Sequence, residues 1–369
     1  EILANPEAYG RSEYGRDEKV MVEFVSANPT GPMHMGNARG GALGDCLAAV
    51  LDKAGYNAWR EFYVNDAGNQ IEKFGCSLEA RYLQIFKGDE IEFPEDGYQG
   101  EDIKDLAKEY ADLNGDSLVN VSAEERKKAL VDYALPKNIK KMQADMEKYK
   151  IFYDKWFFES ELHKSGAVKA VVDLLTEKGL TYEKDGAVWY KNKEVLTQKL
   201  LKEGKSQKYI DNLELKDDVL IRQNGNPTYF TADIAYHKNK FDRGFTTLID
   251  VWGADHHGHV MRMKGAMDAI GYDGDKLNVV LMQLVKLVKD GELVRMSKRT
   301  GKAIQLGDLL DEVPVDSARF LFNTKEANTQ MDFDLDLAVS QDNQNPVYYV
   351  QYAHARICSI FKSLAKEGI

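Results

Sequence analysis

The chain has 369 residues, of which 43% are hydrophobic and 30% are charged, which is ordinary for a globular protein of two or three domains. Its formal net charge of −11 argues against a general affinity for nucleic acids, so we expect no DNA partner and only a local surface for RNA. The sequence contains neither an apolar run near the roughly 18 residues of a membrane span nor a signal-peptide core, which predicts a cytoplasmic protein without a membrane partner.

The first predicted elements follow one another as strand, turn, helix and strand. Residues 20–26 are apolar and rich in β-branched side chains, and the prolines and glycine of residues 28–32 cannot continue a strand. Small and apolar residues recur at helical spacing over residues 36–54, and residues 57–64 read as a second strand. This order predicts an α/β fold with a doubly wound parallel sheet.

The middle of the chain interrupts this alternation. Residues 74–150 have a charged, helical pattern, and residues 182–190 read as a hairpin with Asp185-Gly186 at its turn. We therefore expect an insertion over residues 75–215.

After the insertion, strands and helices alternate again. The predicted elements are a strand at residues 219–222, a helix from Tyr229, a strand at residues 247–252, a helix after Gly258, a strand region at residues 278–288, and helices after residues 301–310. The sheet is thus expected to resume near residue 219.

The three cysteines lie far apart in the sequence. Cys46, Cys76 and Cys358 have no second cysteine or histidine at zinc spacing. We interpret them as reduced thiols in packing positions and expect no structural zinc and no other metal ligation.

A histidine, a glycine and an asparagine stand between the first strand and the first helix. His34, Gly36 and Asn37 would lie at the carboxyl edge of the sheet, where doubly wound folds bind nucleotides. The glycine lets the backbone pass close to an adenine or ribose, and His34 and Asn37 can aim donors at an α-phosphate under attack. Taken alone, these residues more often form a capping turn with a packed histidine.

A tyrosine and an aspartate share one face of the helix that starts at Tyr229. Tyr229 and Asp233 are four positions apart, so their side chains are neighbours. A carboxylate accepts a forked pair of hydrogen bonds from a guanidinium, and an aromatic ring stacks on that planar cation. The pair suits the side chain of arginine as a ligand. The other interpretation makes Asp233 a surface charge and Tyr229 a core residue.

A basic segment, residues 295–299, is flanked by Gly291 and Gly301. A lysine on such a loop can close over ATP and neutralise the departing pyrophosphate, and Lys298 is the lysine that we expect to do so. In isolation the segment also fits a solvated basic turn. Its resemblance to the mobile signature loop of class I synthetases, which follows the turn at His34 in the expected order, favours the ATP-binding interpretation.

Together these motifs resemble the signatures of the arginyl-tRNA synthetases. Asn37 departs from them, because the family usually has histidine there, and Arg295 stands where the signature loop of class I synthetases usually has lysine. The segments that carry the resemblance are residues 22–40, 63–70, 252–259, 291–301 and 345–356.

The resemblance implies an enzyme that activates L-arginine with ATP and Mg²⁺ and transfers it to tRNA(Arg), with bound tRNA required for activation, and we expect a monomer. The implied catalytic residues are His34, Asn37 and Lys298. The implied ATP-binding residues are these three with Gly36, Gly253, Asp255, His256, His257, Arg295, Met296 and Ser297. The implied arginine-binding residues are Glu23, Ser26, Asn28, Tyr229 and Asp233.

The resemblance also divides the chain. It implies a Rossmann-like catalytic domain in two halves, residues 20–74 and 216–310, split by a connective insertion of helices and strands at residues 75–215. Because the first residue is Glu1 and the last segment stops within a helical pattern, we expect a fragment of a longer enzyme. The remaining parts are a linker at residues 1–19, a connecting helical region at 311–345 and the start of a helical anticodon-binding domain at 346–369.

Other functions fit parts of the sequence. Another class I synthetase is one alternative, although a cysteine-specific enzyme would need zinc and a glutamate-specific one a cation where Glu23 and Asp233 stand. A related nucleotidyltransferase of small metabolites shares the turn at His34. A catalytically silent RNA-binding or scaffold protein would not need Lys298 and Asp233. A metal-dependent phosphoesterase site at residues 255–257 would require further aspartates that the sequence does not place.

Overall fold

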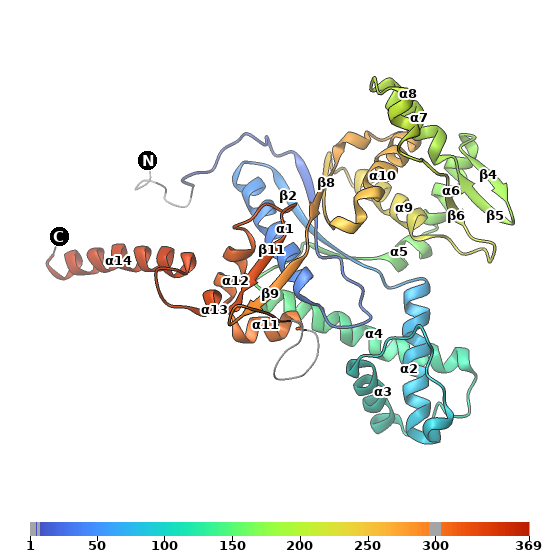
Figure 1. The fold of residues 1–369 in the computed structure, drawn as a ribbon, viewed down its shortest axis with the longest axis horizontal. Helices are drawn as coiled ribbons and strands as arrows, with labels where there is room; N and C mark the ends of the chain where they lie inside the picture. Colours follow the sequence, from blue (N-terminus) through green and yellow to red (C-terminus); the bar gives the residue numbers. More distant parts are fainter. Residues whose placement is uncertain (1–4, 6–7, 295–303, 369) are drawn as a thin grey trace. The chain divides into compact units, whose positions relative to one another are not determined.

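Five strands form the central sheet of the computed structural model (Figure 1), which describes residue 5, residues 8–294 and residues 304–368. The strands, in spatial order, are β3 (Lys155–Phe158), β2 (Asn57–Val64), β1 (Lys19–Glu23), β7 (Thr247–Gly253) and β8 (Leu277–Met282). β1 pairs in parallel with β2 and β7, and β2 pairs in parallel with β3. The predicted parallel α/β sheet is therefore confirmed.

The chain divides into two compact units. Unit 1 comprises residues 1–28, 44–69 and 153–281. Unit 2 comprises residues 29–43, 70–152 and 282–369. The domain boundaries expected from the sequence divide the chain differently and stay a prediction.

Unit 1 packs its helices on the sheet through one hydrophobic core. Met21 of β1 and Leu248 of β7 share this core with Ile234 and Met267 from two helices, and all four side chains are fully buried. Burial of such side chains is the main force that holds helices on a sheet. The helical elements in or entering unit 1 are α1 (Met35–Lys53), α5 (Glu159–Lys164), α6 (Ala167–Glu177), α9 (Tyr229–Asp242), the 3₁₀ turn η2 (Ala254–His256), α10 (His257–Ile270) and the 3₁₀ turn η3 (Gly274–Lys276).

The strand expected to resume the main sheet, β6 (Asp218–Ile221), instead belongs to a second, three-stranded sheet. Its neighbour is the predicted hairpin, β4 (Thr181–Lys184) and β5 (Ala187–Tyr190), and both pairs in this sheet are antiparallel. A short apolar run carries no signal for the sheet it joins. After β3, the next strand of the main sheet is β7, and α7 (Asn192–Lys202) and α8 (Gln207–Asp211) lie between β5 and β6 in the chain.

β3 is a second difference from the sequence prediction. Its residues fall inside the expected insertion at residues 75–215, yet they form an edge of the main sheet beside β2. Phe157 is buried and Phe158 pairs with Val64, so this strand completes the sheet next to the end of β2. β3 has only four residues, and they show no alternation of apolar and polar side chains. A strand could therefore not be predicted there from the sequence.

Unit 2 contains a helical cluster and a small sheet. The helices of the cluster share a core that includes Phe74, Leu78, Ile103 and Leu130. They are α2 (Asn69–Lys87), the 3₁₀ turn η1 (Gly88–Glu90), α3 (Glu101–Asn114) and α4 (Ala123–Lys148), which confirms the helical pattern expected over residues 74–150. The small sheet has the order β10 (Glu292–Val294), β9 (Val285–Lys289) and β11 (Met331–Asp334).

The strand region expected at residues 278–288 is two strands in two sheets, β8 and β9. The backbone between them has other partners, since Gln283 N–H donates to the carbonyl of Ala327 at 2.8 Å and its carbonyl accepts from Arg39 at 2.9 Å. These bonds end the first ladder and turn the chain into the second.

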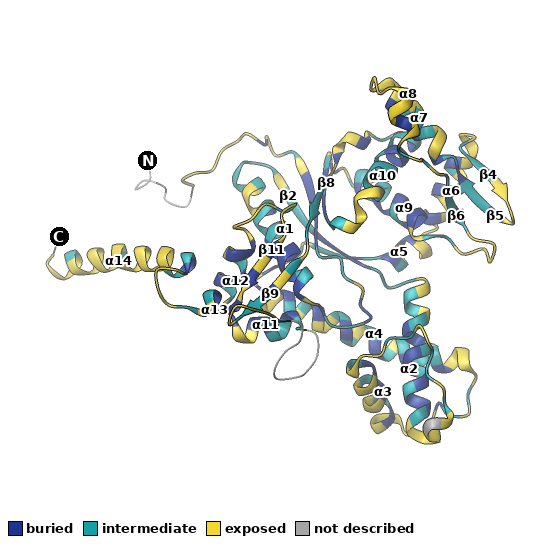
Figure 2. Cartoon of the chain, viewed as in Figure 1, coloured by how far each residue is buried: buried dark blue, intermediate teal, exposed yellow. Residues whose placement is uncertain are grey.

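The last part of unit 2 is mainly helical, although β11 falls within residues 311–345, which were expected to form a helical region. Its helices are α11 (Leu306–Glu312), α12 (Val315–Phe322), α13 (Leu335–Val339) and α14 (Pro346–Lys366). Figure 2 shows α14 mostly exposed, with Val347 as its one buried residue. Among the described residues, no helix has both the length and the apolar composition needed to cross a membrane.

Candidate functional site

The turn before α1 folds around the backbone of His34. His34 N–H donates to Asn37 Oδ1 at 2.9 Å, and Gly36 N–H donates to His34 Nδ1 at 3.2 Å. Because Nδ1 accepts a hydrogen bond, the proton of a neutral imidazole lies on Nε2. Partial desolvation lowers the pKa of His34, which favours that neutral form. Nε2–H of His34 and the amide of Asn37 are therefore the donors that this turn can offer to an anion.

The structure gives a second reason for a glycine at position 36, in addition to the close approach of a ligand expected from the sequence. A Cβ added at Gly36 would lie 3.2 Å from Cε1 and 3.3 Å from Nδ1 of His34. The absence of a side chain at Gly36 thus makes room for the His34 ring, whose Nδ1 accepts the Gly36 N–H.

The chain that follows the signature loop joins this turn. Leu306 N–H donates to the carbonyl of Met33 at 2.9 Å, and Gln305 forms an isolated antiparallel bridge with His34. Four of the expected site residues, Arg295, Met296, Ser297 and Lys298, lie outside the described residues.

Arg39 is a buried cation in unit 2 to which the sequence analysis assigned no role. Its residue is 1% exposed, and its guanidinium donates to the carbonyls of Gln283 and Thr329 at 2.9 Å and of Glu326 at 2.8 Å. The side chain fastens α1 to the segments that lead into β9 and β11. The signal in the sequence that could have indicated a buried arginine is its position among the small and apolar residues of α1.

In unit 1, Glu23 ends β1 and is held by the segment that follows it. Ser26 Oγ donates to Glu23 Oε1 at 2.7 Å and accepts from Tyr63 N–H at 3.1 Å. Val25 and Ser26 have φ angles of 72° and 43°, a left-handed conformation that is unusual for a β-branched residue. Asn28 is exposed and makes no side-chain hydrogen bond with the described part of the chain.

Tyr229 and Asp233 lie on the first turn of α9. Tyr229 is 38% exposed, so the alternative in which it is a core residue is wrong. Asp233 Oδ2 lies 2.9 Å from His259 Nε2, and the aspartate side chain is 33% exposed. A partly open carboxylate that a neighbouring side chain already orients is suited to bind a cation. His259, which the sequence analysis placed in a motif without a role, is thus part of this group.

The residues expected at the nucleotide after β7 are open to solvent. Gly253 ends the strand, and the side chains of Asp255 and His256 are 82% and 58% exposed, with 3.7 Å between the carboxylate and the imidazole. His257 is also exposed and starts α10. Their position at the carboxyl end of a parallel strand is where α/β sheets bind ligands.

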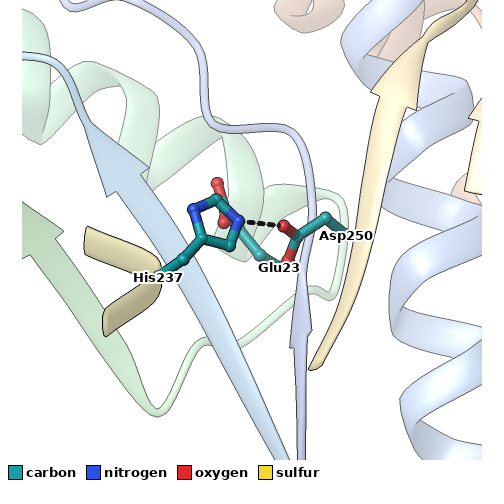
Figure 3. A group of neighbouring side chains, drawn as sticks. All are labelled: Glu23, His237 and Asp250. Carbon is teal, nitrogen blue, oxygen red and sulfur yellow. Dashed lines mark hydrogen bonds and ion pairs between the residues drawn. The ribbon is translucent and has the colours of Figure 1, made fainter. Parts of the chain in front are cut away.

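Among the described residues, the set with metal-ligand spacing is Glu23, His237 and Asp250 (Figure 3). All three are buried, but a protein cation already lies among them. Lys240 Nζ donates to Glu23 Oε2 at 2.5 Å and to Asp250 Oδ1 at 2.8 Å. The donor set is therefore satisfied by an ammonium group, and we assign no metal to it.

Comparisons with known proteins agree over nearly the whole chain. The family model described as tRNA synthetases class I (R), catalytic domain, matches residues 1–357. An arginine–tRNA ligase of Ruminiclostridium cellulolyticum is 60% identical over 370 residues, which cover all of this chain and 63% of that protein. One of Caldanaerobacter subterraneus subsp. tengcongensis is 60% identical over 362 residues, covering 98% of this chain and 61% of that protein. The chain thus spans less than two thirds of the length of these curated relatives.

Solved structures share the fold. A Campylobacter jejuni structure described as an arginyl-tRNA synthetase has a TM-score of 0.84 and 38% identity, covering 98% of this chain and 75% of that one. The Thermus thermophilus arginyl-tRNA synthetase has a TM-score of 0.70 at 20% identity, covering 98% of this chain and 68% of that one, and supports the fold alone. The sheet described above is therefore the Rossmann-like sheet of class I synthetases.

Proposed function

Since the chain belongs to the class I arginyl-tRNA synthetase family, we propose that the protein is part of an arginine–tRNA ligase. The observation that carries the choice of arginine is the carboxylate of Asp233, partly open on the first turn of α9 beside Tyr229 and oriented by His259. A carboxylate next to an exposed aromatic ring fits a planar guanidinium better than it fits the neutral or acidic side chains of other amino acids.

The reaction that we propose has two steps. An oxygen of the arginine carboxylate attacks the α-phosphorus of ATP, which forms arginyl-adenylate and releases pyrophosphate. A hydroxyl of the terminal adenosine of tRNA(Arg) then attacks the arginyl carbonyl carbon and releases AMP. Mg²⁺ enters with ATP, on its phosphate oxygens.

We assign electrostatic roles to the catalytic residues. The Nε2–H of His34 and the amide of Asn37 are donors for the α-phosphate, and Lys298 neutralises the departing pyrophosphate. The backbone pairing of residues 305–306 with Met33 and His34 supports a shared role of the two motifs, because it holds the segment that follows the signature loop in the sequence beside the turn. Gly253, Asp255, His256 and His257 are proposed to contact the nucleotide.

ATP–pyrophosphate exchange on the full-length enzyme tests this function. The twenty amino acids are compared, each with and without tRNA(Arg), and we expect exchange with arginine in the presence of tRNA. Exchange with another amino acid would indicate another class I synthetase. Exchange that none of the twenty amino acids stimulates would indicate a nucleotidyltransferase of other metabolites. A monomeric state and a cytoplasmic location stay predictions.

A further inference from the structure

Lys240 places an ammonium group in the interior of unit 1. Its side chain is 0% exposed, and its Nζ lies 4.4 Å from the centre of the Tyr236 ring in addition to its bonds with Glu23 and Asp250. Burial of an ammonium group is costly unless carboxylates and hydrogen bonds compensate for the lost water. Lysine is rarely fully buried, and a domain that already has a large hydrophobic core does not need a buried ammonium for its stability.

The bonds of Lys240 lead to both carboxylates that the family resemblance implies for arginine, Glu23 and Asp233. Glu23 is held on each of its oxygens, by Ser26 on Oε1 and by Lys240 on Oε2. Asp250 binds Lys240 with Oδ1, and its Oδ2 lies 2.6 Å from His237 Nε2 (Figure 3). The other ring nitrogen of His237 lies 2.7 Å from the carbonyl oxygen of Asp233. The network thus runs from the side chain of Glu23 to the backbone of Asp233.

The charges of this network balance. Both ring nitrogens of His237 lie within hydrogen-bonding distance of an oxygen, the carbonyl of Asp233 for Nδ1 and Oδ2 of Asp250 for Nε2. Burial alone would raise the pKa of Asp250, but the charges of Lys240 and His237 outweigh it and lower the pKa to about 2. Two carboxylates therefore meet two cations, and Glu23 adds no net negative charge to the pocket. A monocation such as arginine then requires one further carboxylate.

We propose that Lys240 is a positioning residue for arginine recognition: its ammonium fixes the Glu23 carboxylate and cancels its charge, so that Asp233 supplies the charge that pairs with the guanidinium. This inference rests on the function proposed above. It assigns Lys240 no contact with the substrate, since the side chain of Lys240 is 0% exposed and its Nζ donates to the buried Glu23 and Asp250.

The ionisation of Glu23 should depend on Lys240. Burial raises the pKa of the Glu23 carboxyl, and the ammonium of Lys240 opposes that rise. Without Lys240, the pKa of Glu23 should rise further, which favours its protonated form. The ionisable side chains that face Glu23 are Lys240, His237 and Tyr236 from α9, Asp250 from β7, Tyr63 from β2 and Tyr153 from the segment before β3.

The test uses the full-length enzyme with a charge-balanced pair of substitutions, Lys240→Met with Asp250→Asn, because Lys240→Met alone leaves two buried carboxylates for one cation. We expect the KM for arginine to rise at least about tenfold near neutral pH while the KM for ATP stays within about twofold. The arginine KM should fall again as the pH is raised and Glu23 ionises. Lys238→Met is the matched control on α9, since Lys238 forms a surface pair with Asp242 at 2.6 Å.

Three results decide the proposal. An unchanged arginine KM overturns it, and so does a loss that arginine and ATP share equally at every pH, because that pattern describes a purely structural residue. If the paired variant does not fold, Lys240→Arg keeps the charge and moves the donors, and an arginine KM equal to that of the wild type then overturns the proposal. A wild-type enzyme that shows no exchange with arginine instead refutes the proposed function, independently of the variants.

Discussion

Asp233 Oδ2 lies 2.9 Å from His259 Nε2, which connects the first turn of α9 with the first turn of α10. The imidazole of His259 packs in turn against Phe230 and Trp252, with ring centroids 5.6 Å and 5.4 Å away. The carboxylate proposed for arginine binding is therefore held in one orientation by the protein itself. Such preorganisation lowers the entropy lost when a ligand binds.

Asp233→Asn should raise the KM for arginine by about two orders of magnitude, since a guanidinium in this pocket loses its counter-charge. Arginine-dependent pyrophosphate exchange at saturating ATP measures the change. The same variant should discriminate less between arginine and its neutral isostere citrulline. An arginine KM within about threefold of the wild type would refute the pocket.

His259→Phe is the matched control for this prediction. It keeps a ring against Phe230 and Trp252 but removes the hydrogen bond to the aspartate. We expect a smaller rise of the arginine KM, about tenfold, because the charge of Asp233 remains and only its orientation is lost.

Lys298→Ala should lower the rate of arginine activation by about 10²-fold or more, as expected when one donor to a transition state is lost. Single-turnover formation of arginyl-adenylate gives this rate without contributions from product release. Lys286→Ala is a suitable control, since Lys286 is an exposed lysine on β9. A wild-type rate in Lys298→Ala would remove this lysine from the mechanism.

Arg39→Met should destabilise unit 2 by about 3 kcal/mol or more, because three carbonyls lose a charged donor inside the protein. Urea unfolding followed by circular dichroism measures the free energy. Arg11→Met removes an ion pair with Asp52 in which both side chains are 52% exposed, and it should cost less than about 1 kcal/mol. Equal effects of the two variants would contradict the role given to Arg39.

The order of the elements around β1 was predictable from the sequence, but the sheets to which β3 and β6 belong were not. β1 is a short apolar run, and α1 has small and apolar residues at helical spacing. The glycine-containing turn between them marks where the strand ends and the helix begins, so all three signals predict the same elements. β3 and β6 have four residues each, so period and length cannot tell which sheet they join. The sheet that each strand joins is decided by its pairing in the folded protein, of β3 with β2 and of β6 with β5.

Residue types with an obvious chemistry were also predictable, but their partners were not. Tyr229 and Asp233 could be read from their spacing on one helix, as could the capping pattern at His34. Lys240 lies seven positions beyond Asp233, and nothing in the sequence separates it from the surface lysine Lys238. Its burial depends on carboxylates of β1 and β7 that come together only in the folded sheet.

Asp250→Asn should reduce the loss of stability in acid. The pKa of Asp250 is lowered from 3.8 to about 2 in the folded protein, so its contribution is fully present above pH 3.8 and is lost as the pH falls toward 2. The difference is worth about 2 kcal/mol. Urea unfolding of wild type and variant at about pH 5 and about pH 3 measures it, and we expect the steeper decline in the wild type. Parallel declines would mean that another group titrates there.

Asn37→His should preserve or raise the rate of arginine activation. Asn37 Oδ1 accepts the N–H of His34 at 2.9 Å, and a neutral histidine at this position can accept the same bond through Nδ1 while Nε2–H remains a donor. A histidine can also become protonated, which would strengthen its interaction with a phosphate that gains charge in the transition state. Single-turnover adenylate formation compares the two side chains, and Asn37→Ala, which offers neither acceptor nor donor, should be slower than both. A rate for Asn37→His as low as that for Asn37→Ala would mean that the turn requires the amide itself, with Oδ1 as the cap and Nδ2 as the donor in fixed positions.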